Sequence, residues 1–247
     1  MPKSRIIIEL IDNTVPLEKS LSRLLALAKD VDNDLLYSWV SRELKGYDKE
    51  NDQLPDYRKW DSVSLIYTGI NGQYQVTKNP LPKEWVPEEA YKQLSDVRMY
   101  DGISRVIELK ESTQPTVFDC TSLAGFVSKM TNGMVSCTSI YAEIPKEFLG
   151  QICESVKEKT LLALLELEKQ YGCLDDLFID TSNASKGAIK NKNDEINNKI
   201  QLNVILNEPN KKEPWYSKVT WQLIIPIIIA VVSPPLTLLL SNKISKG

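Results

Sequence analysis

Near its carboxyl end the chain carries twenty uncharged residues, Trp221 to Leu240, in the segment WQLIIPIIIAVVSPPLTLLLSNKISKG. Twenty residues of α-helix span roughly 30 Å, which is the thickness of the hydrocarbon core of a bilayer. A helix in a protein core would have to avoid water on every side over the same length. We therefore expect one transmembrane helix over residues 221–240, inside a membrane tail of residues 215–247.

The flanks of this stretch also fit a membrane span. Trp221 lies at its boundary, shortly after Trp215 and Tyr216, and tryptophan and tyrosine are enriched where membrane meets water. The amino terminus has only a short apolar run, Ile6 to Ile8, which is too short for a signal peptide. We expect a single-pass carboxyl-terminal anchor in the bacterial inner membrane, with the amino-terminal domain in the cytoplasm. More lysines precede the span than follow it, which favours this orientation: Lys211, Lys212 and Lys218 against Lys243 and Lys246.

Prolines interrupt the expected span at Pro226, Pro234 and Pro235. Each proline removes an amide donor, and hydrocarbon supplies no water to bond the carbonyl left over. The hydroxyls of Ser233 and Thr237, another subunit or pore water could take that place. A kinked helix packed in a bundle offers these partners more easily than a lone anchor does. Two interpretations stay open: a passive anchor, and a homo-oligomer whose kinked spans perturb the membrane.

The rest of the chain has an ordinary globular composition, with 42% hydrophobic and 26% charged residues among 247. The formal net charge of −3 provides no basic face, so direct nucleic-acid binding is not expected. Histidine is absent, which excludes Ser-His-Asp and Cys-His hydrolases. We expect no cofactor and no bound metal, and we take the cysteines as reduced core thiols because none forms a CxxC pair: Cys120, Cys137, Cys153 and Cys173.

The apolar spacing predicts an α+β domain that is rich in helices and has a small antiparallel sheet. A helix follows Pro16, and a second helix, capped by Asp32 or Asn33 and ended by Gly46, completes a helical hairpin. The other expected elements are listed in chain order: a β-hairpin over SVSLIYTGINGQYQVT with a type I′ turn at Asn71-Gly72, helices opening at Pro87 and Asp101, a strand and helix within PTVFDCTSLAGFVSKMTNG, a strand over MVSCTSIYAEI, and a long helix from about Pro145 to Tyr171 closed by Gly172.

Residues 181–214 are rich in asparagine and lysine, with eight asparagines between Asn183 and Asn210. We interpret this segment as a linker between a domain of residues 1–180 and the membrane tail. Its one expected ordered part is KIQLNVIL, residues 199–206, which fits an edge strand of the main sheet.

Four segments, in order, carry a family resemblance: LLYSWVSRELKGY, LPDYR, PLP and VKEKTLLALLELEKQYG. Together they resemble the AbiTii domain of bacterial abortive-infection proteins, over roughly residues 6–180. The resemblance implies a role in phage defence, with a domain that senses or docks rather than catalyses. We expect as partners membrane lipid, through the tail, and either a nucleotide second messenger or another protein of a defence system.

One group of aromatic and charged residues, within 22 positions of one another, is a candidate ligand or partner site. In the functional interpretation, Arg58 offers its planar donors to a phosphate or carboxylate, and the aromatic rings offer stacking surfaces. In the structural interpretation, Arg58 pairs with Glu43 or Asp56, and Trp39 and Tyr47 belong to the core. The whole group is Trp39, Glu43, Tyr47, Asp56, Tyr57, Arg58 and Trp60.

A nuclease is the remaining alternative, because Glu108-Leu109-Lys110 forms an E-x-K triplet. Metal-dependent nucleases use such a triplet, with an upstream acid such as Asp56 or Asp101, to hold Mg²⁺ and polarise water. They place the triplet on a strand, whereas here the pattern predicts a helix. We expect no catalytic residue.

Overall fold

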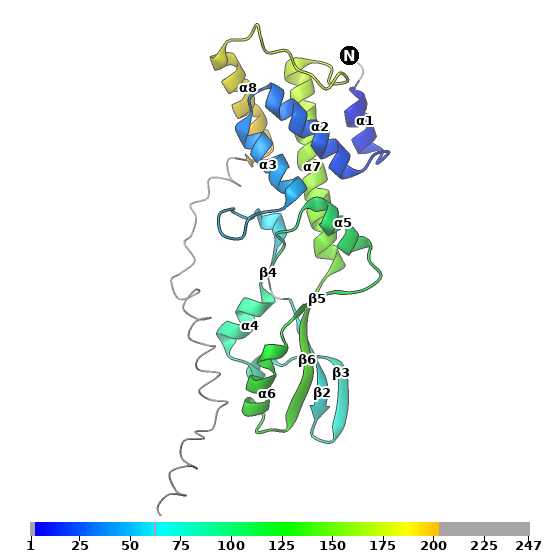
Figure 1. The fold of residues 1–247 in the computed structure, drawn as a ribbon, viewed down its shortest axis with the longest axis vertical. Coiled ribbons are helices and arrows are strands. Elements are labelled where there is room, and N and C mark those ends of the chain that lie inside the picture. The colour runs from blue at the N-terminus through cyan, green and yellow to red at the C-terminus, as the bar shows by residue number, and fades with distance from the viewer. Residues whose placement is uncertain (1–2, 62, 203–247) are drawn as a thin grey trace, which may run out of the picture. The chain divides into compact units, whose positions relative to one another are not determined.

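The computed structural model describes residues 3–61 and 63–202 of the chain, and within them it has an α+β fold rich in helices (Figure 1). The helices are α1 (Arg5–Ile11), α2 (Leu17–Asp30), α3 (Asp34–Lys45), α4 (Glu88–Ser95), α5 (Ile103–Glu111), α6 (Ala124–Met130), α7 (Lys146–Tyr171) and α8 (Lys186–Lys199), with short 3-10 turns η1 (Asp56–Arg58), η2 (Lys83–Trp85) and η3 (Thr121–Leu123). The strands are β1 (Lys59–Trp60), β2 (Leu65–Asn71), β3 (Tyr74–Pro80), β4 (Val97–Arg98), β5 (Thr116–Asp119) and β6 (Val135–Ile144).

The predicted helical hairpin is present as α2 and α3, which pack against each other. Asn33 caps α3 by accepting a hydrogen bond from the backbone N–H of Leu36, and Gly46 ends the helix at a φ of +98°. That backbone conformation is one that glycine adopts without a steric penalty, which is why the helix stops there. The helix α1 was not predicted; it buries Ile6, Ile7 and Leu10.

The long helix α7 organises the helical part, and α1, α2, α5 and α8 all contact it (Figure 1). The apolar face predicted for this helix is confirmed, because its members are buried and belong to one continuous core with residues of α2 and α3. Burying one such side chain stabilises a fold by about 1.5–3 kcal/mol. The buried apolar residues of the face are Phe148, Leu149, Ile152, Val156, Ala163, Leu164 and Leu167.

Four strands form an antiparallel sheet in the order β3-β2-β6-β5, and α6 packs on β6. The predicted β-hairpin is β2 and β3, but its turn differs from the prediction. Asn71 pairs with Tyr74, so the two-residue loop is Gly72-Gln73, and among these only Gly72 has a positive φ, +61°. A positive φ at the first loop residue alone is the pattern of a type II′ turn. The short strands β1 and β4 pair separately.

Residues 186–199, which the sequence pattern assigned to a linker, form the helix α8 instead. Ser185 caps it through the N–H of Ala188, and Ile196, Ile200 and Leu202 are buried. The linker prediction is therefore wrong for these residues, because a small apolar face on α8 packs on α7. The edge strand predicted for residues 199–206 is wrong for residues 199–202, where the chain ends the helix and turns; its remainder lies outside the described residues.

The expected membrane span, residues 221–240, lies outside the described residues. In residues 3–61 and 63–202, no helix is both long and apolar enough to cross a bilayer. The residues expected at the kinks also lie outside the described residues: Pro226, Ser233, Pro234, Pro235 and Thr237.

The four cysteines are free thiols, but they do not all belong to the core. Cys120 and Cys153 are buried, whereas Cys137 is half-buried and Cys173 is exposed. The prediction of core thiols is wrong for Cys173, which follows the glycine that ends α7. Burial raises the pKa of the Cys120 and Cys153 thiols.

Candidate functional site

The candidate residues come from three consecutive elements that meet beside the end of α3. Glu43 lies in the last turns of α3, Tyr47 follows its terminal glycine, and Tyr57 and Arg58 lie on η1. Trp39 lies one helical turn before Glu43, on the same buried face of α3. The fold therefore brings a buried carboxylate, a buried guanidinium and three aromatic rings together. We call this group the Glu43 network; its members are Trp39, Glu43, Tyr47, Tyr57 and Arg58.

The Glu43 carboxylate is the acceptor at the centre of this network. Its Oε1 accepts from the Tyr47 hydroxyl at 2.6 Å and from the Tyr57 hydroxyl at 2.7 Å. Its Oε2 accepts from Nη2 of Arg58 at 2.5 Å, and the Trp39 Nε1–H donates to the Tyr57 oxygen at 3.0 Å. Every member thus has a hydrogen-bond partner inside the network, as buried polar groups require.

Nε of Arg58 also donates to Oε1 of Glu43, at 3.4 Å, whereas Nη1 is directed at the main chain. Nη1 donates to the carbonyl oxygen of Met99 at 3.1 Å and to that of Asp101 at 2.8 Å, and its guanidinium carbon lies 4.9 Å from the centre of the Tyr47 ring. The side chains of Arg58 and Glu43 are both 0% exposed. Arg58 therefore joins α3 to the segment between β4 and α5.

The backbone at this junction is packed as closely as the side chains. The N–H of Tyr47 donates to the carbonyl of Tyr100 at 2.8 Å, and the N–H of Met99 donates to the carbonyl of Arg58 at 2.9 Å. A Cβ atom added at Gly102 would lie 2.5 Å from the carbonyl oxygen of Leu44. Glycine at position 102 is what allows the two backbones to approach.

The environment shifts the acid–base behaviour of the network. Burial, reinforced by the charge of Glu43, raises the pKa of both Tyr47 and Tyr57 well above the ordinary value. Burial alone would lower the pKa of Arg58, but the charge of Glu43 and its hydrogen bond outweigh burial and raise it. The two hydroxyls stay protonated donors and the guanidinium stays charged at neutral pH.

Two members of the predicted group stand apart. The Trp60 ring lies 5.4 Å from that of Phe148 on α7 and serves the core. Asp56 is exposed and pairs with Lys59, so of the two partners predicted for Arg58 the structure selects Glu43. The structural interpretation is thus confirmed for Arg58, Trp39 and Tyr47, and ligand binding at the group stays a prediction.

Comparison with protein families places the whole junction inside one match. The model of the AbiTii family matches residues 4–193. The chain belongs to the AbiTii family. The match includes Glu43, Arg58 and the sheet, and it ends within α8. AbiTii membership suggests a role in phage defence by abortive infection. Searches of curated proteins and of solved structures found no match to the chain.

The AbiTii fold places the E-x-K triplet on the helix α5, as the pattern predicted. The Glu108 carboxylate, 68% exposed, pairs with Arg105 of the same helix at 2.7 Å. In the described part of the chain, no three His, Cys, Asp or Glu side chains are grouped so that they could hold a metal ion.

Sequence reasoning missed two of the Arg58 partners in this AbiTii chain, Met99 and Asp101. Both contribute only their carbonyl oxygens, more than forty positions from Arg58 along the chain. No residue type marks such a contact, because any residue carries a carbonyl. The sequence does contain one signal of this close packing, Gly102. It directly precedes a helix, and the packing leaves no room for a side chain at this position.

Proposed function

We propose that this AbiTii protein acts in abortive infection as a membrane-anchored defence protein. Its folded unit senses an infection signal or a partner protein in the cytoplasm, and its carboxyl-terminal segment enters the inner membrane. Homo-oligomers then bring the segments together, and their proline-interrupted spans permeabilise the membrane, so that the infected cell stops growing. The role of the folded unit is binding rather than catalysis.

The family match carries this proposal, because it ends before the uncharged segment begins. AbiTii similarity covers residues 4–193, whereas the twenty uncharged residues run from Trp221 to Leu240. Twenty apolar residues match the hydrocarbon thickness of a bilayer. This order along the chain supports two separable parts, one for recognition and one for the membrane.

The Glu43 network supports the recognition role of the folded unit. Its buried ion pair and its hydrogen bonds join α3, η1 and the segment before α5. The buried network fixes how these elements pack, and a fold held in one shape loses less conformational entropy on binding. A folded unit of this kind suits a docking or sensing module.

Replacing the uncharged segment tests the active role of the tail. The variant carries an unrelated anchor without prolines in place of Trp221–Leu240, and the measurement is phage plaque number in cells that express it. We expect the variant to reach the membrane fraction in the amount of the parent and to lose protection. Full protection by the variant would contradict the membrane-perturbing role, and recovery of the parent in the soluble fraction would contradict anchoring.

A second candidate is a docking module that recruits a separate effector, for which the tail is only an anchor. The observation that favours it is a group of exposed apolar side chains around one end of the sheet. Tyr74 is 77% exposed at the turn of the β2–β3 hairpin, and the Gly72 N–H donates to the carbonyl of the exposed Met134. In this candidate the anchor replacement keeps protection, and Tyr74→Ser with Met134→Ser loses it.

A further inference from the structure

Exposed apolar side chains gather at the end of the sheet where two of its turns lie. Ile70 is 51% exposed, Tyr74 77%, Met130 59% and Met134 67%. The first two flank the β2–β3 turn and the other two flank the turn between α6 and β6, at the same end of the sheet (Figure 1). A hydrogen bond from the Gly72 N–H to the Met134 carbonyl, at 2.8 Å, joins the two turns. We call Ile70, Tyr74, Met130 and Met134 the apolar tip.

The turn that carries the methionines is fixed by hydrogen bonds of its own. The Thr131 hydroxyl donates to the Val127 carbonyl at 2.8 Å. The Gly133 N–H donates to the carbonyl of Ser128 at 2.8 Å, and the φ of Gly133, +77°, is one that glycine adopts freely. The backbone therefore holds both methionines at the surface, where they add little to the core.

The elements that carry the apolar tip contain no acidic residue. Residues 62–83 and 120–142, which include β2, β3, α6 and most of β6, have no Asp or Glu, although the chain has 33 acidic residues in all. Their charged side chains are Lys78, Lys83 and Lys129, of which Lys129 lies in the last turn of α6. This end of the sheet is therefore apolar and basic, in a chain whose formal net charge is −3.

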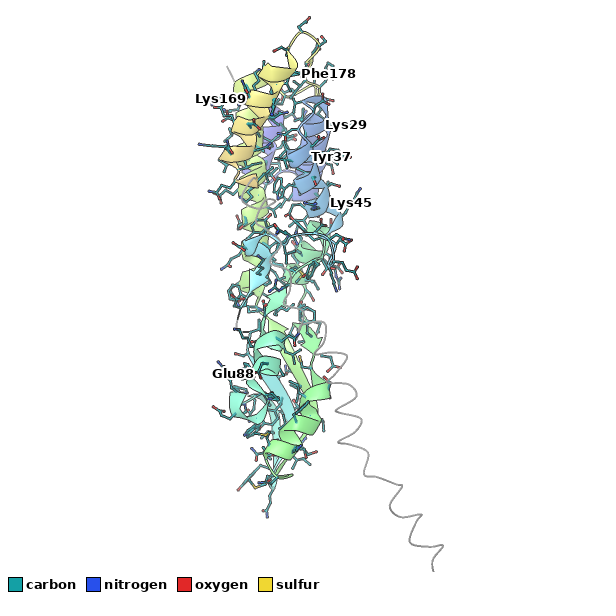
Figure 2. All side chains as sticks on the ribbon, turned by 90° about the vertical axis from the view of Figure 1, so that its left-hand side faces the viewer. Lys29, Tyr37, Lys45, Glu88, Lys169 and Phe178 are labelled. Carbon is teal, nitrogen blue, oxygen red and sulfur yellow. The ribbon has the colours of Figure 1, made fainter. Side chains whose placement is uncertain are left out.

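Exposed aromatic side chains in the helical part of the unit have acidic neighbours instead. Tyr37, 41% exposed, follows Asp34 by about one turn of α3, and Phe178, 64% exposed, lies between Asp176 and Asp180 in the sequence. Figure 2 labels both aromatic residues. Single exposed rings among charges are ordinary surface, whereas a group of exposed apolar side chains without acids marks a contact site.

The chemistry of the apolar tip matches the surface of an anionic membrane. Tyrosine is enriched at the level of the lipid headgroups, and other apolar side chains of a protein that lies on a membrane enter the boundary of the acyl chains. Lysines are attracted to anionic lipids, which repel carboxylates. A protein could cover the same side chains, but a membrane is an anionic surface that the chain itself is expected to reach.

The length of chain between the folded unit and the uncharged segment sets how far the apolar tip can lie from that membrane. Leu202 is the last described residue, and the uncharged segment starts at Trp221. The chain between them can span about 65 Å at most, even when fully extended. An anchored tail therefore keeps the tip at a high effective concentration relative to lipid, at which weak contacts are sufficient.

We propose that the apolar tip lies on the anionic membrane surface that the tail enters, with Tyr74 and the methionines in the headgroup region and Lys129 beside the lipid phosphates. The proposal rests on the anchored tail of the proposed function, and it adds a second membrane contact that orients the folded unit. The docking-module candidate assigns the same surface to an effector protein, and the following experiment separates the two.

Hydroxyl-radical footprinting of the full-length protein in vesicles tests this contact. Vesicles of phosphatidylethanolamine and phosphatidylglycerol supply the anionic surface, and vesicles of phosphatidylcholine supply a neutral one. We expect Tyr74, Met130 and Met134 to be oxidised at least about fivefold more slowly in the anionic vesicles, the effect of one lysine beside anionic lipid. Phe178, whose exposed fraction is close to that of Met134, is the internal control and keeps its rate.

Flotation of the vesicles after a carbonate wash separates failure of the anchor from failure of the tip. Protein that does not float would overturn the tether and, with it, the proposal. Protein that floats while both methionines are oxidised at equal rates in the two lipids would overturn the tip contact alone. Equal and slow oxidation would assign the surface to a second copy of the chain, and equal and fast oxidation would leave it to an effector protein.

Two variants connect the protection to named side chains. Lys129→Glu places a carboxylate at the tip and is expected to abolish the difference between the two lipids, whereas Lys190→Glu, at an exposed lysine of α8, keeps it. Tyr74→Ser is expected to speed the oxidation of Met134 in anionic vesicles about tenfold, the effect of losing one buried apolar side chain, and its control Tyr37→Ser is not. Parent-like protection in both test variants, with parent-like unfolding temperatures, would contradict the assignment.

Discussion

The carboxylate of Glu43 and the guanidinium of Arg58 form a 2.5 Å ion pair in which neither side chain has exposed surface. The fold tolerates the two buried charges because the neighbouring polar groups form hydrogen bonds with them. Two tyrosine hydroxyls donate to the acid, and two main-chain carbonyls accept from the base. Removing one charge therefore leaves the other buried without a partner, whereas removing both leaves no unpaired charge.

The first prediction concerns the difference between removing one charge and removing both. Glu43→Gln lowers the free energy of unfolding by about 3–5 kcal/mol, because Arg58 stays buried without its counter-charge. The double variant Glu43→Leu with Arg58→Met recovers a large part of that loss, since it removes both charges together. Urea denaturation measures both values. Asp56→Asn, which breaks the exposed pair with Lys59, is the matched control and changes stability little. A Glu43→Gln variant as stable as this control would contradict the account.

Stability should also depend on pH through the two tyrosines. Burial raises the pKa of Tyr47 and Tyr57 in the folded state. Above about pH 10 the unfolded chain releases these protons while the folded chain keeps them. The unfolded state then binds fewer protons, so stability is full below about pH 10 and falls as pH rises further.

Denaturation at several pH values between about 8 and 11 measures this loss. The variant Tyr57→Phe removes one of the two hydroxyls and is expected to show a shallower fall than the parent. The control Tyr74→Phe changes an exposed tyrosine and keeps the parent slope. Equal slopes in all three proteins would show that the buried hydroxyls do not cause the fall.

Close backbone packing at Gly102 gives a third prediction. Gly102→Ala places a methyl group 2.5 Å from the carbonyl oxygen of Leu44, which forces the two backbones apart. We expect a loss of about 1–3 kcal/mol in the free energy of unfolding. Gly125→Ala is the control, because a Cβ there meets nothing within 4 Å and alanine favours the helix α6. The prediction fails if both substitutions have the same effect.

The sequence pattern was sufficient for the elements that have strong local signals. Asn33, Gly46 and Gly172 lie at helix ends where caps were expected, and the long apolar face of α7 is buried as predicted. Pairing of Arg58 with Glu43 was one of two interpretations, and burial decides between them. The carbonyls of Met99 and Asp101 could not be predicted, because only the tertiary fold brings them to Arg58.

The helix α8 shows the opposite case, in which composition outweighed a periodic signal. Ser185 is a good helix cap, and Ile189, Ile196 and Ile200 follow at helical spacing. The many asparagines and lysines around them led to a linker prediction. Asn193 and Asn197 lie on the same buried side as the isoleucines. These asparagines are therefore part of a packed helix and not of a solvated linker.

A fourth prediction separates binding from nuclease chemistry. The double variant Glu108→Ala with Lys110→Ala removes both functional groups of the E-x-K triplet on α5 and keeps full protection against phage. Glu108 pairs only locally, with Arg105 three residues before it, so the fold should tolerate the change. Plaque counts at matched expression measure protection. A loss of protection with an unchanged unfolding temperature would favour the nuclease.

The membrane potential of infected cells tests the central proposal most directly. Cells that express the full-length protein are followed with a voltage-sensitive dye during phage challenge, next to cells whose Trp221–Leu240 segment is replaced by a proline-free anchor. We predict that the parent cells depolarise before growth stops and that the replacement cells keep their potential and are lysed by phage. An unchanged potential in parent cells that are fully protected would contradict the account.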